Sequence, residues 1–311
     1  MELIERIKNN DPTLIVAVLP FFNDLRDLSF IEGNTNLTEL NACHNRITDI
    51  SALSRNYSLR TLTMDDCCVS DLSPLSHNVS LTELHITSNS ISDISALCSN
   101  TTLTTLSLCH NHISDISPLR YNNTLKWLSL SHNQIADISD LKYNTGLKTL
   151  HIAANFITDI SALRYNNTLD TLYIHYNHIA DISVLRYNTS LTVLNLTENQ
   201  IADIESLKYN QTLKALFMAN NQVSDIGILS YNNSLTTLHI SNNQITDISA
   251  LHYNDTVTTI FLNNNHISNS DLVYYKNLTQ TQRHNNKILH FTLYERLINN
   301  LNLRTHFSLI S

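Results

Sequence analysis

Leucine and isoleucine recur along this chain with a fixed spacing of 22 residues. The pattern L-T-x-L-x-L-x-x-N-x-I-x-D-I-S-x-L-x-Y-N-x-x begins at Leu37 and restarts without insertion up to the copy that begins at Val257. Self-similarity at a short fixed period indicates a solenoid, in which each coil buries its apolar face against the next coil. We therefore expect eleven coils over residues 37–278.

Within each copy the apolar spacing predicts one short strand and one tight turn. In residues 125–130 the leucines alternate as in a strand with one buried face. The apolar positions of residues 135–141 return to the same core, and Asp137 is suited to cap a helical or 3-10 turn. We expect an α/β solenoid, a horseshoe with a parallel sheet on its concave face and short 3-10 or irregular turns on its convex side.

Two asparagines of each copy have predicted structural roles. The first follows the strand, where its side chain can bond exposed backbone groups of the neighbouring coil and build a ladder. The second, such as Asn122, closes the return loop and is expected to point inward. The expected ladder consists of Asn89, Asn111, Asn133, Asn155, Asn177, Asn199, Asn221 and Asn243.

The ends of the array are expected to be covered, because an open coil exposes apolar surface. Residues 1–14 contain a short amphipathic segment and are expected to form an N-terminal capping helix. Residues 15–36 match a degenerate first repeat, with Val18 in register with the inward strand positions. Residues 279–311 have apolar residues at helical spacing and are expected to form a C-terminal helical cap; a partner-binding amphipathic helix is the alternative.

Composition excludes several function classes. The chain has 311 residues with only 3 Gly and 4 Pro, too few for glycine-rich phosphate loops. Its formal net charge of -8 disfavours nucleic-acid binding. Its 5 Cys are odd in number and follow no disulfide or CxxC framework. No segment has the pattern of a signal peptide or a transmembrane helix, and nine glycosylation motifs fall on the inward Asn of the return loop. We expect a cytoplasmic protein that contacts no membrane.

The repeat resembles a known family. Units such as LTTLSLCHNHISDISPLRYNNT, residues 103–124, resemble the 22-residue leucine-rich repeats of bacterial internalins and of the protein-phosphatase regulatory subunit. Asn122 departs from that pattern, which has a second outer Leu there, and is similar to the ribonuclease-inhibitor type. The Asn-rich form with a Lys/Arg-Tyr-Asn tripeptide resembles leucine-rich repeat proteins of giant DNA viruses. The resemblance implies a non-enzymatic scaffold that binds proteins on its concave face.

The varied outward positions of the strands predict where a partner binds. Most of the 15 His fall in four columns on or just after the strands, together with aromatic residues and few charges. Such side chains give a binding surface contact area at low entropic cost. The alternative is neutral sequence drift, because an exposed repeat position accepts many residue types. The predicted partner-binding residues are Trp127, His151, Phe156, Tyr173, His175, Tyr176, His178, Phe217 and His239.

Metal binding and catalysis have less support from the sequence than protein binding. His110 and His132 are expected to be lateral neighbours with Cys109 close by, but a zinc site needs three or four converging ligands. Asp65 and Asp66 could be combined with nearby histidines as an acid/base group, although a solvated polar edge explains them more simply. We expect no catalytic residue, no metal and no cofactor. A phosphatase-regulator-like scaffold and a His-dependent metal- or pH-responsive binder remain as alternatives.

A second surface combines basic and aromatic residues. Arg120, Lys142, Arg164, Arg186 and Lys208 each precede the recurring Tyr and stack in consecutive coils. An Asp column with the same period can offset their charge. We interpret this stripe as a structural Tyr stack with solvated basic residues, and an acidic protein partner as the next interpretation.

Overall fold

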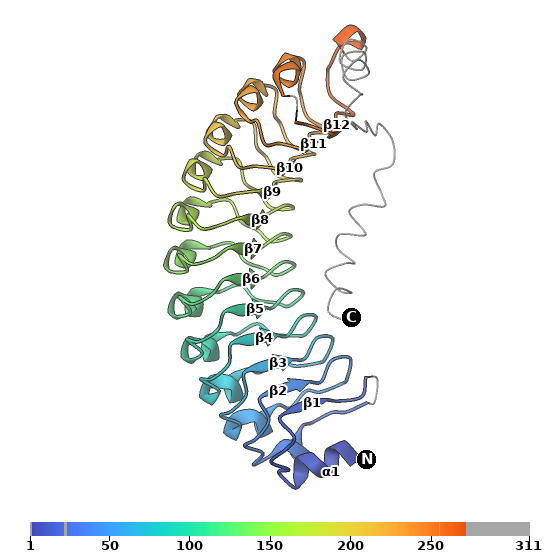
Figure 1. The fold of residues 1–311 in the computed structure, drawn as a ribbon, viewed down its shortest axis with the longest axis vertical. Helices are drawn as coiled ribbons and strands as arrows, with labels where there is room; N and C mark the ends of the chain where they lie inside the picture. Colours follow the sequence, from blue (N-terminus) through green and yellow to red (C-terminus); the bar gives the residue numbers. More distant parts are fainter. Residues whose placement is uncertain (1, 22–23, 255, 272–311) are drawn as a thin grey trace.

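The computed structural model describes residues 2–21, 24–254 and 256–271, and shows one curved solenoid (Figure 1). Twelve three-residue strands form a single parallel sheet in which each strand pairs with the next in sequence. The strands are β1 Val16–Val18, β2 Glu39–Asn41, β3 Thr61–Thr63, β4 Glu83–His85, β5 Thr105–Ser107, β6 Trp127–Ser129, β7 Thr149–His151, β8 Thr171–Tyr173, β9 Val193–Asn195, β10 Ala215–Phe217, β11 Thr237–His239 and β12 Thr259–Phe261. The predicted solenoid with its parallel sheet is confirmed.

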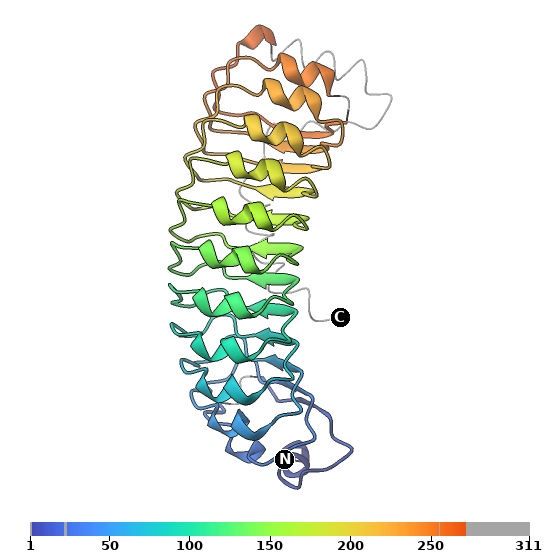
Figure 2. The same cartoon turned by 90° about the vertical axis from the view of Figure 1, so that its left-hand side faces the viewer.

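Short 3-10 helices, labelled η, line the outer side of the curve, opposite the sheet (Figures 1 and 2). They are η1 Ser29–Ile31, η2 Ser51–Arg55, η3 Ser73–His77, η4 Ser95–Ser99, η5 Ser117–Tyr121, η6 Ser139–Tyr143, η7 Ser161–Tyr165, η8 Ser183–Tyr187, η9 Glu205–Tyr209, η10 Gly227–Tyr231 and η11 Ser249–Tyr253. The 22-residue coil leaves no room for longer helices. In η6 the Asp137 carboxylate accepts a hydrogen bond from the Ser139 N–H at 2.7 Å, so Asp binds the first exposed N–H of the turn.

The core is a continuous column of leucine and isoleucine between the sheet and the 3-10 helices. Every repeat contributes the same positions, for example Leu125, Leu128 and Leu130 from the strand side, all fully buried. Burial of these side chains supplies the main driving force for stacking.

The first coil departs from the regular spacing. β1 pairs with β2 at an offset of 23 residues, with Ala17 opposite Leu40, whereas later strand pairs are offset by 22. Ala17 is therefore buried and Val18 is 53% exposed, so the expected inward position of Val18 is wrong by one residue. The spacing returns to 22 at the bridge between Asp27 and Asp49, so the first coil holds one extra residue between its strand and its turn.

Helix α1, Glu2–Lys8, precedes the first coil. Its Ile7 is buried, and the buried Asn34 donates a hydrogen bond from Nδ2 to the Ile7 carbonyl at 3.1 Å. This contact ties α1 to the end of the first coil. The expected C-terminal cap, residues 279–311, lies outside the described residues, as does the end of the last repeat.

Candidate functional site

A run of six aromatic and imidazole rings crosses the middle of the sheet's inner face. His85 on β4 contacts Trp127 on β6, with ring centroids 6.2 Å apart. Ser107 of β5 lies between their strands and is buried, so no large side chain separates the two rings. Trp127 contacts His151 at 5.6 Å, and His151 meets Tyr173 edge to face at 4.7 Å.

The run continues beyond the strand ends. Tyr173 contacts His175 at 6.2 Å, and His175 contacts Tyr176 at 5.5 Å, both in edge-type geometry. Edge-to-face pairs hold rings in fixed orientations. We call these six residues, His85, Trp127, His151, Tyr173, His175 and Tyr176, the ring run. His85 was not among the predicted site residues; the small Ser107 between it and Trp127 is the sequence signal that could have indicated the contact.

Two histidines of the ring run, His151 and His175, are uncharged at neutral pH. Burial lowers the pKa of His151 and of His175 to about 4, because the imidazolium would lose its hydration. Burial also raises the pKa of the Tyr173 phenol. Protonation near pH 6, which the pH-responsive alternative requires, is thus not expected at these two histidines.

The remaining predicted contact residues lie apart from the ring run. Phe156 and His178 stack on each other at 6.2 Å on the exposed turn after the ladder Asn. Phe217 is half-buried on β10, opposite Asn195 and His239 in the register. His239 is only 2% exposed and lies against Phe261, so its imidazole presents little surface to a partner.

The residue that precedes the ladder position adopts left-handed backbone geometry in every repeat. Its φ lies between 52° and 57° at eleven positions from His44 to Asn264. Asn, Asp and His tolerate this region better than other L residues. Tyr176, with a φ of 54° and 44% of its side chain exposed, is the bulkiest member of the column. This strain favours a functional reason for an aromatic residue there.

Carboxylates lie at several positions of the inner face. Glu39 and Glu83 point outward from β2 and β4, and Glu198 lies beside Tyr176, whose pKa it helps to raise. The Glu198 carboxylate accepts a hydrogen bond from Asn220 at 2.7 Å. At the first coils, Arg46 is paired with Asp24 at 3.0 Å.

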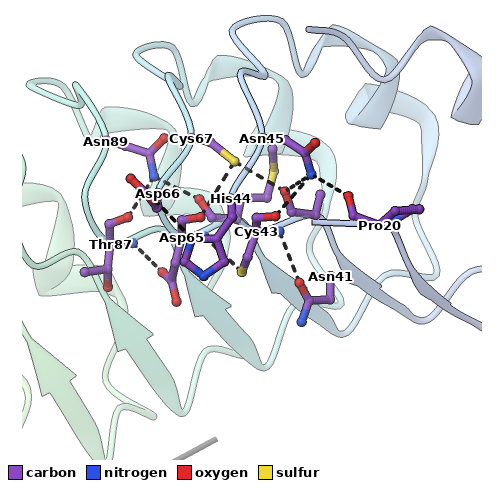
Figure 3. A network of polar contacts seen from close by, with 12 residues as sticks. Pro20, Asn41, Cys43, His44, Asn45, Asp65, Asp66, Cys67, Thr87 and Asn89 are labelled. Carbon is purple, nitrogen blue, oxygen red and sulfur yellow. Dashed lines mark hydrogen bonds and ion pairs between the residues drawn. The ribbon is translucent and has the colours of Figure 1, made fainter. Parts of the chain in front are cut away.

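The acidic end of this face forms a polar network rather than an acid/base site (Figure 3). Asp66 pairs with the His44 Nδ1 at 3.0 Å. Asp65 instead accepts a hydrogen bond from the Thr87 N–H at 2.6 Å, and its own N–H bonds the Cys43 sulfur. His85 belongs to the ring run. The two carboxylates and two histidines are thus divided among different contacts.

The side chains considered as metal ligands also take part in separate contacts. His110 and His132 stack face to face, with centroids 4.0 Å apart, and Cys109 bonds the Ser129 hydroxyl instead. Stacked imidazoles present their nitrogens side by side rather than toward a common point. Among the described residues no group of three or more His, Cys, Asp or Glu side chains is arranged to hold a metal ion.

The Asn ladder binds successive coils together. Asn111 donates from Nδ2 to the Ile86 carbonyl of the preceding coil at 2.9 Å and accepts from the Ile91 N–H at 2.9 Å. Asn89, Asn133, Asn155, Asn177, Asn199, Asn221 and Asn243 repeat both bonds. Their amides satisfy backbone groups that the strand ends leave open, so they hold successive coils together.

The return-loop Asn forms a second internal ladder. Asn122 is fully buried and donates to the carbonyls of Leu97 and Asn100 in the preceding coil, at 3.0 and 2.8 Å. Both acceptors belong to the previous turn, so this position too is structural.

The chain is similar to known repeat proteins in both sequence and structure. The family profile described as leucine rich repeats (2 copies) matches residues 35–77, 79–121, 123–165, 167–209 and 211–251. A solved structure of the internalin InlF from Listeria monocytogenes is 33% identical, with 78% of each chain covered and a TM-score of 0.66. Internalin C2 from the same species is 31% identical over 60% of this chain and 81% of its own, with a TM-score of 0.57.

A more distant match shows the fold alone. The leucine-rich repeat ectodomain of the Arabidopsis thaliana receptor kinase GASSHO1/SCHENGEN3, solved in complex with Casparian strip integrity factor 2, is 21% identical. The alignment covers 80% of this chain and 32% of that one, with a TM-score of 0.69. No curated protein matches the sequence. Within the described ranges, no helix is long and apolar enough to span a membrane.

Proposed function

Since the chain belongs to the leucine-rich repeat family, we propose that it is a non-enzymatic module that binds a protein partner on its concave face, centred on the ring run. The continuous ring contacts from His85 to Tyr176 carry the proposal. Because the rings are already held in place before a partner binds, they lose little conformational entropy on binding. The same contact area therefore gives a higher affinity.

The surrounding charges narrow the kind of partner. An aromatic centre bordered by Glu83 and Glu198 suits a surface with apolar side chains near Lys or Arg. The exposed aromatic face of Tyr176 beside Glu198 suits one such cation in particular. The Asn-rich resemblance to viral repeats extends the proposal to a host or virion protein in the cytoplasm of an infected cell.

Capture from native cell extract tests the proposal, comparing wild type with a Tyr173→Ala/Tyr176→Ala variant. The captured protein is then purified and its affinity measured by calorimetry. We expect the double substitution to weaken binding at least tenfold, because it removes two adjacent rings. A Tyr231→Ala/Tyr253→Ala variant, which removes two exposed tyrosines from the opposite side, is the matched control.

The identity of the captured protein distinguishes the alternatives. A phosphatase catalytic subunit would support the regulator-like scaffold, and capture that requires zinc or fails near pH 6 would support the responsive binder. Equal affinity of both double variants would contradict the concave site, provided that circular dichroism shows both to be folded.

A further inference from the structure

A stripe of half-exposed tyrosines follows the convex side at the ends of the 3-10 helices. Seven consecutive coils from η5 to η11 each contribute one, and their exposed fractions range from 46% to 74%. They are Tyr121, Tyr143, Tyr165, Tyr187, Tyr209, Tyr231 and Tyr253. Isolated exposed aromatics are common on protein surfaces, but a contiguous row of them marks a contact surface.

Cations lie over the faces of the central tyrosines. The Arg164 guanidinium lies 5.4 Å from the Tyr165 ring centroid and 5.2 Å from that of Tyr187 in the next coil. Lys142 lies over Tyr143 at 5.1 Å, and Arg186 over Tyr187 at 5.9 Å. These contacts hold the three charges in a row along the stack.

The cations at the two ends of the row form ion pairs, whereas those at its centre interact with the turn carboxylates only over a longer range. Arg120 pairs with Asp140 at 2.7 Å, and Lys208 pairs with Glu205. In the part of the chain that the structure describes, Lys142, Arg164 and Arg186 take part in no ion pair. Three oriented cations in adjacent coils thus remain available to an anionic ligand.

We propose that this central stretch, from Lys142 to Tyr187, binds an acidic polypeptide segment in extended conformation. Carboxylates of the segment would pair with the three cations, while its backbone and apolar groups would lie on the exposed tyrosine edges. An extended chain rises about 3.3 Å per residue, and neighbouring coils are at least about 4.8 Å apart. A segment of about five residues is therefore long enough to contact all three coils.

The surroundings favour a narrow polypeptide over a nucleic acid. A row of carboxylates, including Asp159 and Asp181, runs parallel to the cations at the opposite end of the 3-10 helices. At a rise of about 2.0 Å per residue, the two rows are roughly 10 Å apart. A duplex, whose major groove alone is about 12 Å wide, would meet this acidic row. Base stacking on Tyr165 and Tyr187 would compete with Arg164, which already lies over both rings.

Fluorescence anisotropy with a labelled deca-glutamate peptide at low salt tests the inference. A Lys142→Gln/Arg164→Gln/Arg186→Gln variant is expected to bind at least tenfold more weakly, and wild-type affinity is expected to fall steeply with salt. The control variant Lys126→Gln/Lys148→Gln/Lys214→Gln removes the same net charge from exposed positions just before β6, β7 and β10. It is expected to bind within about twofold of wild type.

Two further variants and one further probe complete the test. Tyr165→Ala/Tyr187→Ala should weaken peptide binding, and Tyr165→Phe/Tyr187→Phe should restore most of it, because Phe retains the ring face. Absence of peptide binding, or equal losses in the two Gln variants, would overturn the inference. Tighter binding of deca-thymidylate than of deca-glutamate would replace the peptide with a nucleic acid. The Tyr173→Ala/Tyr176→Ala variant should bind deca-glutamate normally, which separates this surface from the concave one.

Discussion

Single residues show most clearly where one coil departs from the repeat. Cys67 occupies a ladder position, and its sulfur reaches the carbonyls of Ala42 and Asp65, at 3.4 and 3.8 Å. An Asn there would donate to the same carbonyls and would accept the Ile47 N–H through an amide oxygen, as Asn111 accepts that of Ile91, where Cys67 offers only a weakly accepting sulfur. Burial raises the pKa of the Cys67 thiol. The thiol is therefore protonated and unreactive at neutral pH, and a reactive cysteine does not explain the loss of the ladder Asn.

Cys67→Asn is therefore expected to stabilise the protein. Added amide bonds to buried backbone groups contribute about 1 kcal/mol to the free energy of unfolding. The midpoint of urea denaturation measures the gain, with Cys67→Ser as a control of similar size that cannot restore both bonds. A Cys67→Asn midpoint at or below that of wild type would show that the coil has adapted to the thiol.

Tyr176 presents the opposite case, in which we expect the consensus residue to improve stability and impair function. Its left-handed backbone disfavours a bulky side chain, so Tyr176→Asn is expected to stabilise the fold by about 1 kcal/mol. The same substitution removes the exposed end of the ring run and should weaken partner binding. Chemical denaturation and calorimetry on one preparation measure both effects; a loss of both stability and binding would argue that the ring supports the fold.

At the scale of the element, the coil was predictable because its constraints are local. The 22-residue period fixes which residues are buried, and the strands and 3-10 turns follow from it. The ring run was only partly predictable, because His85 and Trp127 occupy different columns two coils apart and their contact depends on the small Ser107 in the coil between them. The burial of His239 and the extra residue of the first coil depend on neighbours that the period does not describe.

The return-loop Asn is the element-scale feature whose loss should cost most. Asn122→Ala leaves two buried carbonyls, of Leu97 and Asn100, without their donor, and we expect a loss of about 2–4 kcal/mol in unfolding free energy. Its exposed neighbour offers the control, since Asn123→Ala should change stability by less than about 0.5 kcal/mol. Thermal denaturation of both variants distinguishes a structural amide from a solvated one.

For the whole molecule, buried neutral histidines predict how stability depends on pH. The folded pKa of His151, His175 and His239 is about 4, against about 6.5 in the unfolded chain. The unfolded state therefore binds more protons between these values, and stability is complete above pH 6.5 and falls as the pH is lowered toward 4. Each group contributes at most about 3 kcal/mol to this loss.

Urea denaturation between pH 7 and pH 4.5 measures this slope. A His151→Gln/His175→Gln variant should show a shallower dependence than wild type, whereas the exposed His112→Gln should not. Parallel slopes in all three proteins would assign acid sensitivity to other groups. The turn carboxylates, such as Asp181, have a pKa lowered by hydrogen bonds from Ser183, so their contribution to stability is lost mainly at the acid end of this window and below it.

The ladder bonds join each coil to its neighbour through equivalent atoms, and this equivalence has a consequence for heredity. If residues 147–168 were deleted, Asn177 could donate to the Leu130 carbonyl in the place of Asn155. Unequal recombination within the gene could thus shorten or lengthen the array by whole coils without posing a new folding problem. The same event would bring Tyr173 beside Ser129 and remove His151, so a change in copy number alone would rewrite the inner surface.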